Sequence, residues 1–222
     1  MCGRFVMSTP IPKIVKRFRI KRVAPSGPGI SYNIAPTHET LIVNNEGERQ
    51  LVPARWGLIP SWSKDPSIGS RMINARAETV AEKPAFRHAF RKQRCLVIAD
   101  GFFEWKETGG RKLPMYVRLN SGKPFAFAGL YSIWTSPSDE MIIYTCTIIT
   151  TTANKLLRLI HDRMPVILPE SKEDTWLDSS REDKEELRAL LRPYDADKME
   201  TWEVSPRVNS PGYDFPENIE PI

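Results

Sequence analysis

The sequence predicts an α+β fold in which a curled, mostly antiparallel β-sheet forms a barrel-like core with helices at its flanks. Three observations support this prediction. Apolar stretches of strand length recur along the chain, as in LVIAD and MIIYTCTIIT. Turns that contain Gly or Pro separate these stretches, and helical spacing is confined to short segments. No repeat, low-complexity tract or clear linker interrupts the 222 residues, so we expect one domain over residues 1–222.

The first part of the chain predicts short elements separated by loops. Residues 9–20 have apolar side chains at helical spacing and a basic outer face, which predicts a short helix. Residues 24–37 are rich in Pro, Gly and Ser and predict a loop. Residues 40–45 and 49–58 predict two strands with a turn between them. Residues 60–74 predict a long irregular loop, which is unusual in a compact domain and often functional.

The second part predicts most of the sheet. Helical spacing over residues 78–94, with Phe86 and Phe90 as buried anchors, comes before a buried strand over residues 96–100. Further strands are predicted over residues 114–120, 124–132 and 141–150. Residues 153–160 predict a helix, 161–168 a loop that enters a strand, 180–192 a charged surface helix, and 204–222 an irregular wrap punctuated by proline.

The composition narrows the class of protein. Hydrophobic residues make up 41% of the chain and charged residues 27%, as in globular proteins generally. No stretch approaches the roughly 20 apolar residues of a membrane span, and the N-terminus lacks the pattern of a secretory signal. We therefore expect a cytoplasmic protein that binds no membrane. The net charge of +5 points weakly toward a polyanionic partner.

The cysteine and histidine counts predict no metal site. Three cysteines without CxxC spacing argue against both a disulfide framework and a zinc site, and three histidines leave little else to hold a metal. Cys95 and Cys146 lie in apolar β-rich runs, which favours buried structural thiols. No phosphate-binding lysine loop, dinucleotide fingerprint, HExxH or GxSxG motif is present, so we expect no nucleotide or other cofactor.

Cys2 raises a chemical question, because removal of Met1 would make it the first residue. A free N-terminal cysteine carries a thiol and an amine on adjacent carbons. This pair can trap an aldehyde as an imine that then closes to a thiazolidine ring. The α-amine titrates at ~7.7–8.0, about 2.5 pKa units below lysine, so part of it is neutral and nucleophilic near pH 7. The alternative is an incidental residue in a frayed terminus.

Three other polar residues stand in informative surroundings. Glu104 lies between Phe103 and Trp105 after a buried strand, where it is either salt-bridged or a general acid–base with a raised pKa. His161 follows a predicted helix and either caps it or acts chemically. Asn74 either closes a turn or donates its amide to a substrate.

Arginine and tryptophan gather in the predicted loops. Arginines in loops that also contain tryptophan and proline are typical of single-stranded nucleic-acid binding, where cations contact phosphates and rings stack on bases. The alternatives are surface arginines without a ligand and tryptophans in the core. The basic run RHAFRKQR favours the solvated face of a helix over a binding groove. The candidate residues are Arg4, Arg71, Arg76, Arg163, Trp56 and Trp62.

Six motifs in order, MCGRF, YNIAPT, RWGLIPSW, MINARAET, RCLVIADGFFEW and IHDRMPVIL, resemble the SRAP family. These SOS-response-associated peptidase-type proteins process abasic sites in single-stranded DNA. The resemblance runs from residue 2 to the C-terminal EPI. It implies that Met1 is lost, that the Cys2 amine attacks the open aldehyde of an abasic sugar, and that the thiol closes a thiazolidine, which leaves a DNA–protein crosslink.

The resemblance also implies roles for single residues. Asn74 would orient the Cys2 amine or the sugar, and Glu104 would shuttle protons during crosslinking and its reversal. His161 would hold the sugar hydroxyl or the 3′ phosphate, and would act as base if the Schiff base proceeds to β-elimination, which is lyase activity. For DNA binding the residues implied are Arg4, Asn33, Pro36, Trp56, Trp62, Arg71, Arg76 and Arg163. We expect a monomer that associates with the nucleoid when it acts on DNA.

Two other functions remain open from the sequence. An N-terminal-cysteine peptidase or amidohydrolase would use the Cys2 thiol against a carbonyl group. A non-catalytic single-stranded DNA-binding module would use the arginine and tryptophan loops alone, and its affinity would fall steeply with salt.

Overall fold

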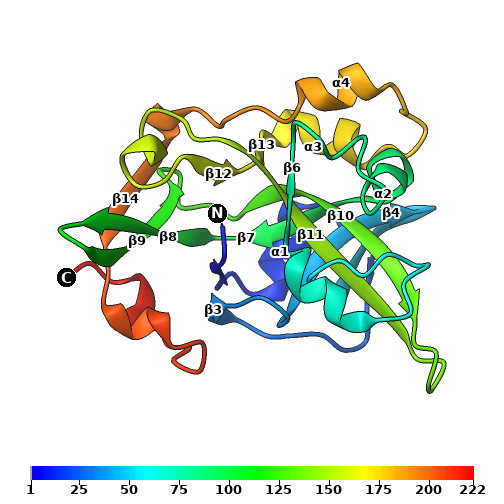
Figure 1. Cartoon of the computed structure of the whole chain (residues 1–222), viewed down its shortest axis with the longest axis horizontal. Coiled ribbons are helices and arrows are strands. Elements are labelled where there is room, and N and C mark those ends of the chain that lie inside the picture. The colour runs from blue at the N-terminus through cyan, green and yellow to red at the C-terminus, as the bar shows by residue number, and fades with distance from the viewer. Residues whose placement is uncertain (1) are drawn as a thin grey trace.

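The computed structural model describes residues 2–222 (Figure 1). The α-helices are α1 (Ile11–Arg17), α2 (Arg87–Lys92), α3 (Glu170–Leu177) and α4 (Lys184–Ala189). The strands are β1 (Phe5–Met7), β2 (Arg22–Val23), β3 (Ser31–Ile34), β4 (Glu39–Glu46), β5 (Glu48–Trp56), β6 (Asn74–Arg76), β7 (Arg94–Ala99), β8 (Gly101–Thr108), β9 (Arg111–Leu119), β10 (Phe125–Thr135), β11 (Ile142–Thr152), β12 (Arg163–Pro165), β13 (Ile167–Leu168) and β14 (Met199–Glu203). Short 3₁₀ turns lie at Pro66–Arg71, Leu157–Leu159, Ala196–Lys198, Pro206–Asn209 and Pro216–Ile219.

Five strands close into a barrel. Strands β5, β4, β7, β10 and β11 pair in that order, each pair antiparallel, and a parallel pairing of β11 with β5 completes the ring. Strand β6 continues along the same edge of β11, also parallel. Closure leaves no free edge within the ring. The curled, mostly antiparallel barrel with flanking helices that the sequence predicts is therefore confirmed.

A second sheet extends from the barrel on the left of Figure 1. Its order is β14-β9-β8-β1-β3, with antiparallel pairing throughout. Strand β8 follows β7 after the single residue Asp100, so one extended segment serves both sheets. The Asp100 carboxylate accepts hydrogen bonds from the backbone N–H groups of Ser8 and Thr9 at 2.6 and 2.8 Å. This contact fixes the end of β1 and, with it, the position of the residues before β1.

Aromatic side chains fill the core between the N-terminal strand and the barrel. Phe5 of β1 meets Trp56 of β5 and Phe127 of β10 edge to face, with ring centroids 5.0 and 5.9 Å apart. All three rings are buried, and edge-to-face packing is a favoured aromatic geometry. The N-terminal segment is therefore packed into the core as well as paired to β3 and β8.

The helical segments are shorter than the sequence predicts. The expected helix over residues 153–160 is only the 3₁₀ turn Leu157–Leu159, which the Asn154 side chain precedes and caps by accepting hydrogen bonds from the N–H groups of Leu156 and Leu157. Helix α2 occupies only the end of residues 78–94, beyond Pro84. Phe86 and Phe90 are buried there as predicted. Helix α4 begins at Lys184, because the Asp183 side chain caps it.

Several elements were not predicted, among them β3, α3 and β14. Strand β3 lies inside the expected loop 24–37, where it pairs with β1. Strand β14 pairs with β9, and helix α3 packs against β7 and β10. Each depends on a partner distant in the sequence.

Candidate active site around Cys2

Cys2 lies three residues before β1 and is fully buried. Asn74, the first residue of β6, donates a hydrogen bond from Nδ2 to the Cys2 carbonyl oxygen at 2.7 Å. Strand β6 is itself held against β11, with Asn74 opposite Ile148. The barrel therefore fixes Asn74, and Asn74 fixes the backbone of Cys2.

Glu104 lies in β8, two residues after the position where Phe102 pairs with Phe5. Its side chain is 2% exposed, and burial raises the pKa of the carboxyl to about 7. Burial also raises the pKa of the Cys2 thiol, and the nearby Glu104 carboxylate raises it further. The site thus holds a thiol that stays protonated at neutral pH beside a carboxyl group that changes charge there. The raised pKa matches the acid–base alternative for Glu104 better than a dominant salt bridge, which would lower it.

His161 follows the turn Leu157–Leu159, so the alternative that it caps a long helix is lost with that helix. Its Nδ1 lies 3.0 Å from the Arg163 backbone nitrogen and 2.8 Å from an Asp162 carboxylate oxygen. The first contact favours an unprotonated Nδ1 and the second a protonated one. Burial lowers the pKa of the imidazole, so the neutral ring, with Nδ1 as acceptor from Arg163, prevails at neutral pH.

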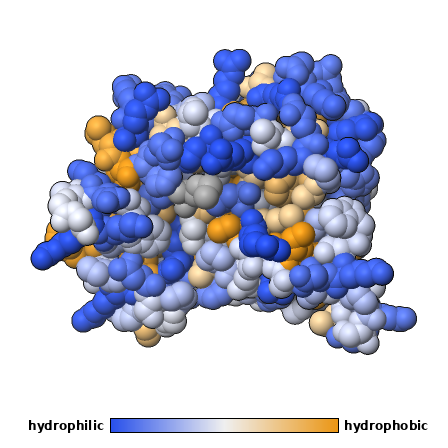
Figure 2. Space-filling model, in the orientation of Figure 1, coloured by the Kyte–Doolittle hydropathy of each residue, from blue (hydrophilic) through white to orange (hydrophobic). Residues whose placement is uncertain are grey.

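Glu104 and His161 line the same cavity, which has a volume of about 420 Å³. The described residues around it also include Trp105, Glu107, Lys112 and Ile160. Figure 2 shows one face of the molecule as mostly hydrophilic, with hydrophobic side chains near its middle and at its left. The structure therefore brings Cys2, Asn74, Glu104 and His161 together, although they are far apart in the sequence.

The predicted DNA-binding residues differ in how far they are exposed to solvent. Trp62, Arg71 and Arg76 are exposed, and Pro36 is partly exposed. Arg163 is paired: its guanidinium donates to both Glu78 carboxylate oxygens at 2.7 and 3.0 Å and to the Thr150 carbonyl at 2.7 Å. Glu78 was not singled out from the sequence, since a carboxylate beside an arginine motif carries no signal of its own.

Trp56 and Asn33 are corrected, because neither presents a surface to a ligand. Trp56 is fully buried, and its indole donates to the Ile73 carbonyl at 2.8 Å. Asn33 is 1% exposed, and its amide donates to the carbonyls of Val208, Ser210 and Tyr213 at 3.2, 2.9 and 2.8 Å. Both side chains are held by partners inside the fold, so we propose no DNA contact for either.

Arg4 belongs with Asn33 in the buried network. It is 8% exposed and donates from one nitrogen to the Asn33 side-chain oxygen at 2.7 Å and to the Val208 carbonyl at 2.6 Å. Arg4 and Asn33 together tie the C-terminal segment to the strands that position Cys2. Their partners are backbone carbonyls about 175 to 204 residues away, which no sequence motif reveals.

Replacing Asn33 with alanine should lower the free energy of unfolding by at least about 2 kcal/mol, because it leaves buried carbonyls and the Arg4 guanidinium without partners. Denaturant unfolding at neutral pH measures this. Asn45→Ala, at an exposed position in the β4–β5 hairpin, is the matched control and should change stability by less than about 0.5 kcal/mol. Equal effects of the two substitutions would contradict the buried network.

Glu104→Gln should stabilise the fold at alkaline pH. The folded protein holds a proton on Glu104 up to about pH 7, whereas the unfolded chain releases it near pH 4.5, so stability falls as pH rises between these values. Glutamine removes this penalty, which amounts to roughly 3 kcal/mol above pH 7. Unfolding of both proteins at pH 4.5 and pH 8.5 tests this, with Glu107→Gln as control. A variant that gains nothing at pH 8.5 would contradict the raised pKa.

The described residues contain neither a cluster of metal-ligating side chains nor a helix that could span a membrane. No group of three or more His, Cys, Asp or Glu side chains within residues 2–222 is placed to hold a metal ion. Over the same residues, every helix is too short or too polar to cross a membrane.

The chain was compared with known proteins. The family model described as SOS response associated peptidase (SRAP) matches residues 1–211. The abasic site processing protein YoqW of Bacillus subtilis is 48% identical over 223 residues, covering 99% of each chain. The abasic site processing protein HMCES of Gallus gallus is 34% identical over 201 residues, covering 80% of this chain and 59% of HMCES.

A crystal structure of a protein from Bacteroides thetaiotaomicron shares the fold, with a TM-score of 0.87 and 29% identity over the full length of both chains. The family match spans nearly the whole chain, including Cys2, Asn74, Glu104 and His161. The chain therefore belongs to the SOS response associated peptidase (SRAP) family.

Proposed function

We propose that this protein senses abasic sites in single-stranded DNA and joins them covalently through Cys2 after Met1 is removed. One observation carries the proposal: the chain places Cys2, Asn74, Glu104 and His161 around one site, in a family whose relatives include proteins named for abasic site processing. Met1 removal is required because a retained methionine ties up the Cys2 nitrogen as an amide.

The reaction begins at the open-chain aldehyde of the abasic sugar. The neutral Cys2 amine adds to C1′, and the carbinolamine loses one water to give an imine. The Cys2 thiol then adds across the C=N bond: sulfur bonds to C1′ and the proton goes to nitrogen, which closes the thiazolidine. The net change is the loss of one water. The same atoms in reverse order release the DNA.

Each neighbouring residue has a role that its geometry supports. Asn74 holds the Cys2 backbone in place. Glu104, with a pKa of about 7, gives a proton to the sugar ring oxygen as the ring opens and takes one from the amine. Neutral His161 lines the cavity that it shares with Glu104. There it would remove the C2′ proton of the imine, so that the 3′ phosphate leaves; this is the lyase branch.

The state of the thiol favours aldehyde trapping over the alternative, an N-terminal-cysteine peptidase or amidohydrolase. A thiol that attacks an acyl carbonyl works as a thiolate, and such sites lower the thiol pKa. In the chain that retains Met1, burial and Glu104 raise the pKa of the Cys2 thiol instead. Aldehyde trapping starts from the amine and delivers the thiol second, to an imine that is already activated.

The DNA strand would reach the site through exposed cations and an exposed ring. Arg71 and Arg76 precede and follow Asn74 in the chain and are exposed, as is Trp62. Arg163 would bind a phosphate only after it releases the Glu78 carboxylate. We propose that the protein acts as a monomer, in the cytoplasm and on the nucleoid.

The test uses three single-stranded oligonucleotides of one sequence: one with a natural abasic nucleotide, one with a tetrahydrofuran analogue that has no aldehyde, and one intact. After incubation without reductant, a denaturing gel should show a heat-resistant complex with the natural abasic strand alone. Equal non-covalent binding to all three strands, with no such complex, would favour the binding-module alternative and contradict the proposal.

A further inference from the structure

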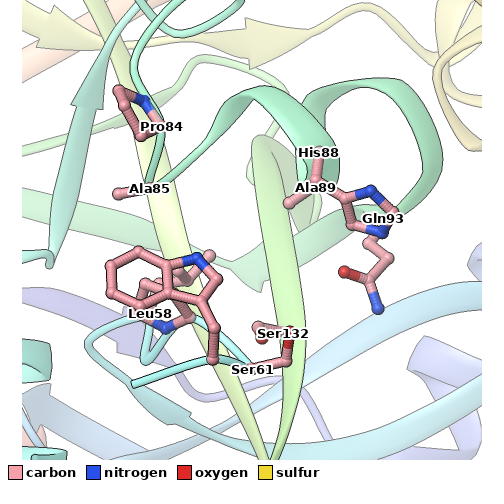
Figure 3. A pocket seen from close by; sticks show the side chains of 10 residues that line it. Leu58, Ser61, Pro84, Ala85, His88, Ala89, Gln93 and Ser132 are labelled. Carbon is pink, nitrogen blue, oxygen red and sulfur yellow. The ribbon is translucent and has the colours of Figure 1, made fainter.

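A second cavity lies away from Cys2, between the loop that follows β5 and the start of α2 (Figure 3). Its volume is about 280 Å³, just below the roughly 300–1,000 Å³ of sites for drug-sized ligands. We infer that it is a nucleobase pocket, which holds one base of the DNA strand close to the abasic nucleotide. This inference rests on the proposed function, since it takes the DNA strand as the ligand.

Four hydrogen-bonding side chains face this cavity without partners. The described residues form no hydrogen bond with the side chains of Ser61, His88, Gln93 or Ser132. Ser132 is 4% exposed, so its hydroxyl lies at the floor of the pocket. In Figure 3 these side chains surround one space between α2 and β10. Ser61 and His88 are exposed and Gln93 is partly exposed, so their donors and acceptors are open to a ligand, and together with the Ser132 hydroxyl at the floor they suit the edge of a base.

An exposed ring completes the pocket. Trp62 lines it and is 65% exposed, although a tryptophan usually buries most of its ring. The loop that carries Trp62 is held in place, because the Trp134 indole donates to the Ser63 carbonyl at 2.7 Å and Asp65 caps the turn Pro66–Arg71. A fixed exposed indole beside a polar floor offers stacking and edge contacts together.

The pocket is connected to the reactive site by one hydrogen bond. Leu58 lines the pocket, and its N–H donates to the carbonyl of Met72 at 3.2 Å, two residues before Asn74. This contact ties the segment that leads to Asn74 to the wall of the pocket, and the inference places the strand along it. Two exposed cations with no ion pair among the described residues, Lys64 and Arg87, lie within two residues of pocket residues in the sequence and suit phosphates.

A proline-rich peptide is the other ligand that an exposed tryptophan beside Pro60 and Pro84 suggests. Such peptides bind mainly through apolar rings in aromatic grooves. They would use none of the four polar side chains that line the pocket, so the chemistry of the pocket favours a base.

The experiment measures non-covalent binding, so that it does not depend on crosslinking. Each single-stranded oligonucleotide of a series carries a tetrahydrofuran nucleotide at the reactive position. A second tetrahydrofuran nucleotide, placed at a different position in each member of the series, removes one further base. At one position, removal of the base should weaken binding by roughly 5- to 100-fold, the range for a base stacked on an aromatic side chain. Gln93→Ala and Ser132→Ala should each reduce that penalty, whereas the matched control Ser138→Ala, in the exposed β10–β11 hairpin, should leave it unchanged.

The outcomes separate the two proposals. If no position carries a penalty, or if the penalty is the same in Gln93→Ala, Ser132→Ala and the unaltered protein, the pocket does not hold a base and the inference is wrong. If a proline-rich peptide does not displace the oligonucleotide, and if removal of the base weakens binding less in Gln93→Ala and Ser132→Ala than in the unaltered protein, the inference stands. A failure to crosslink natural abasic DNA would overturn the proposed function and leave this binding measurement intact.

Discussion

Replacing Cys2 with serine should abolish the stable crosslink and leave strand cleavage. Serine keeps the α-amine after Met1 removal, so the imine still forms at C1′ and β-elimination at that imine continues. The serine hydroxyl is a far weaker nucleophile than a thiol toward an imine, so ring closure fails. Denaturing gels that resolve both the protein–DNA complex and the cleaved strand measure the two products together.

Cys146→Ala is the matched control for Cys2→Ser. Cys146 is also fully buried, but it lies in β11 and takes no part in the reaction. This variant should crosslink as the unaltered protein does. A Cys2→Ser protein that keeps the heat-resistant complex, or a Cys146→Ala protein that loses it while folded, would contradict the role given to Cys2.

The second large effect is expected for Glu104→Gln, which should slow crosslinking by roughly 10²- to 10⁴-fold, the usual contribution of a general acid–base. The reaction should also lose its pH maximum. Below the pKa of about 7 the carboxyl is protonated and cannot accept the amine proton, and above it the carboxylate cannot donate to the sugar oxygen. The unaltered protein should therefore react fastest near pH 7, and the variant should not.

Glu107→Gln serves as the control for Glu104→Gln, because Glu107 lines the same cavity but is exposed. Single-turnover crosslinking rates between pH 5 and pH 9 compare the three proteins. If Glu104→Gln kept the full rate and the maximum near pH 7, the proton shuttle would belong to another group.

The sequence was sufficient for the barrel and insufficient for the helices. Strand patterns such as RCLVIA and IIYTCTIIT are set by local alternation and burial, and they became β7 and β11. Helix ends depended instead on single side chains, as at Asn154 and Asp183. Strands β3 and β14 could not be predicted, because each forms only against a partner distant in the chain.

The candidate site was also predicted only in part from the sequence. Cys2, Asn74, Glu104 and His161 were predicted through motifs, and the structure places them around one site. Asn33 and Trp56 lie in motifs too, but their burial is decided by contacts with Val208, Phe5 and Ile73 that no local pattern shows. The pocket lined by Gln93 and Ser132 could not be predicted from the sequence, because three segments distant in the chain form it.

The most direct test of covalent capture is the intact mass of the protein before and after incubation with a single-stranded oligonucleotide bearing one abasic nucleotide. The first spectrum establishes that Met1 is absent. The second, recorded without reductant, should show a rise equal to the mass of the oligonucleotide less one water, which is the balance of a thiazolidine at Cys2. A protein that lacks Met1, binds the strand and shows no rise in mass would contradict covalent capture.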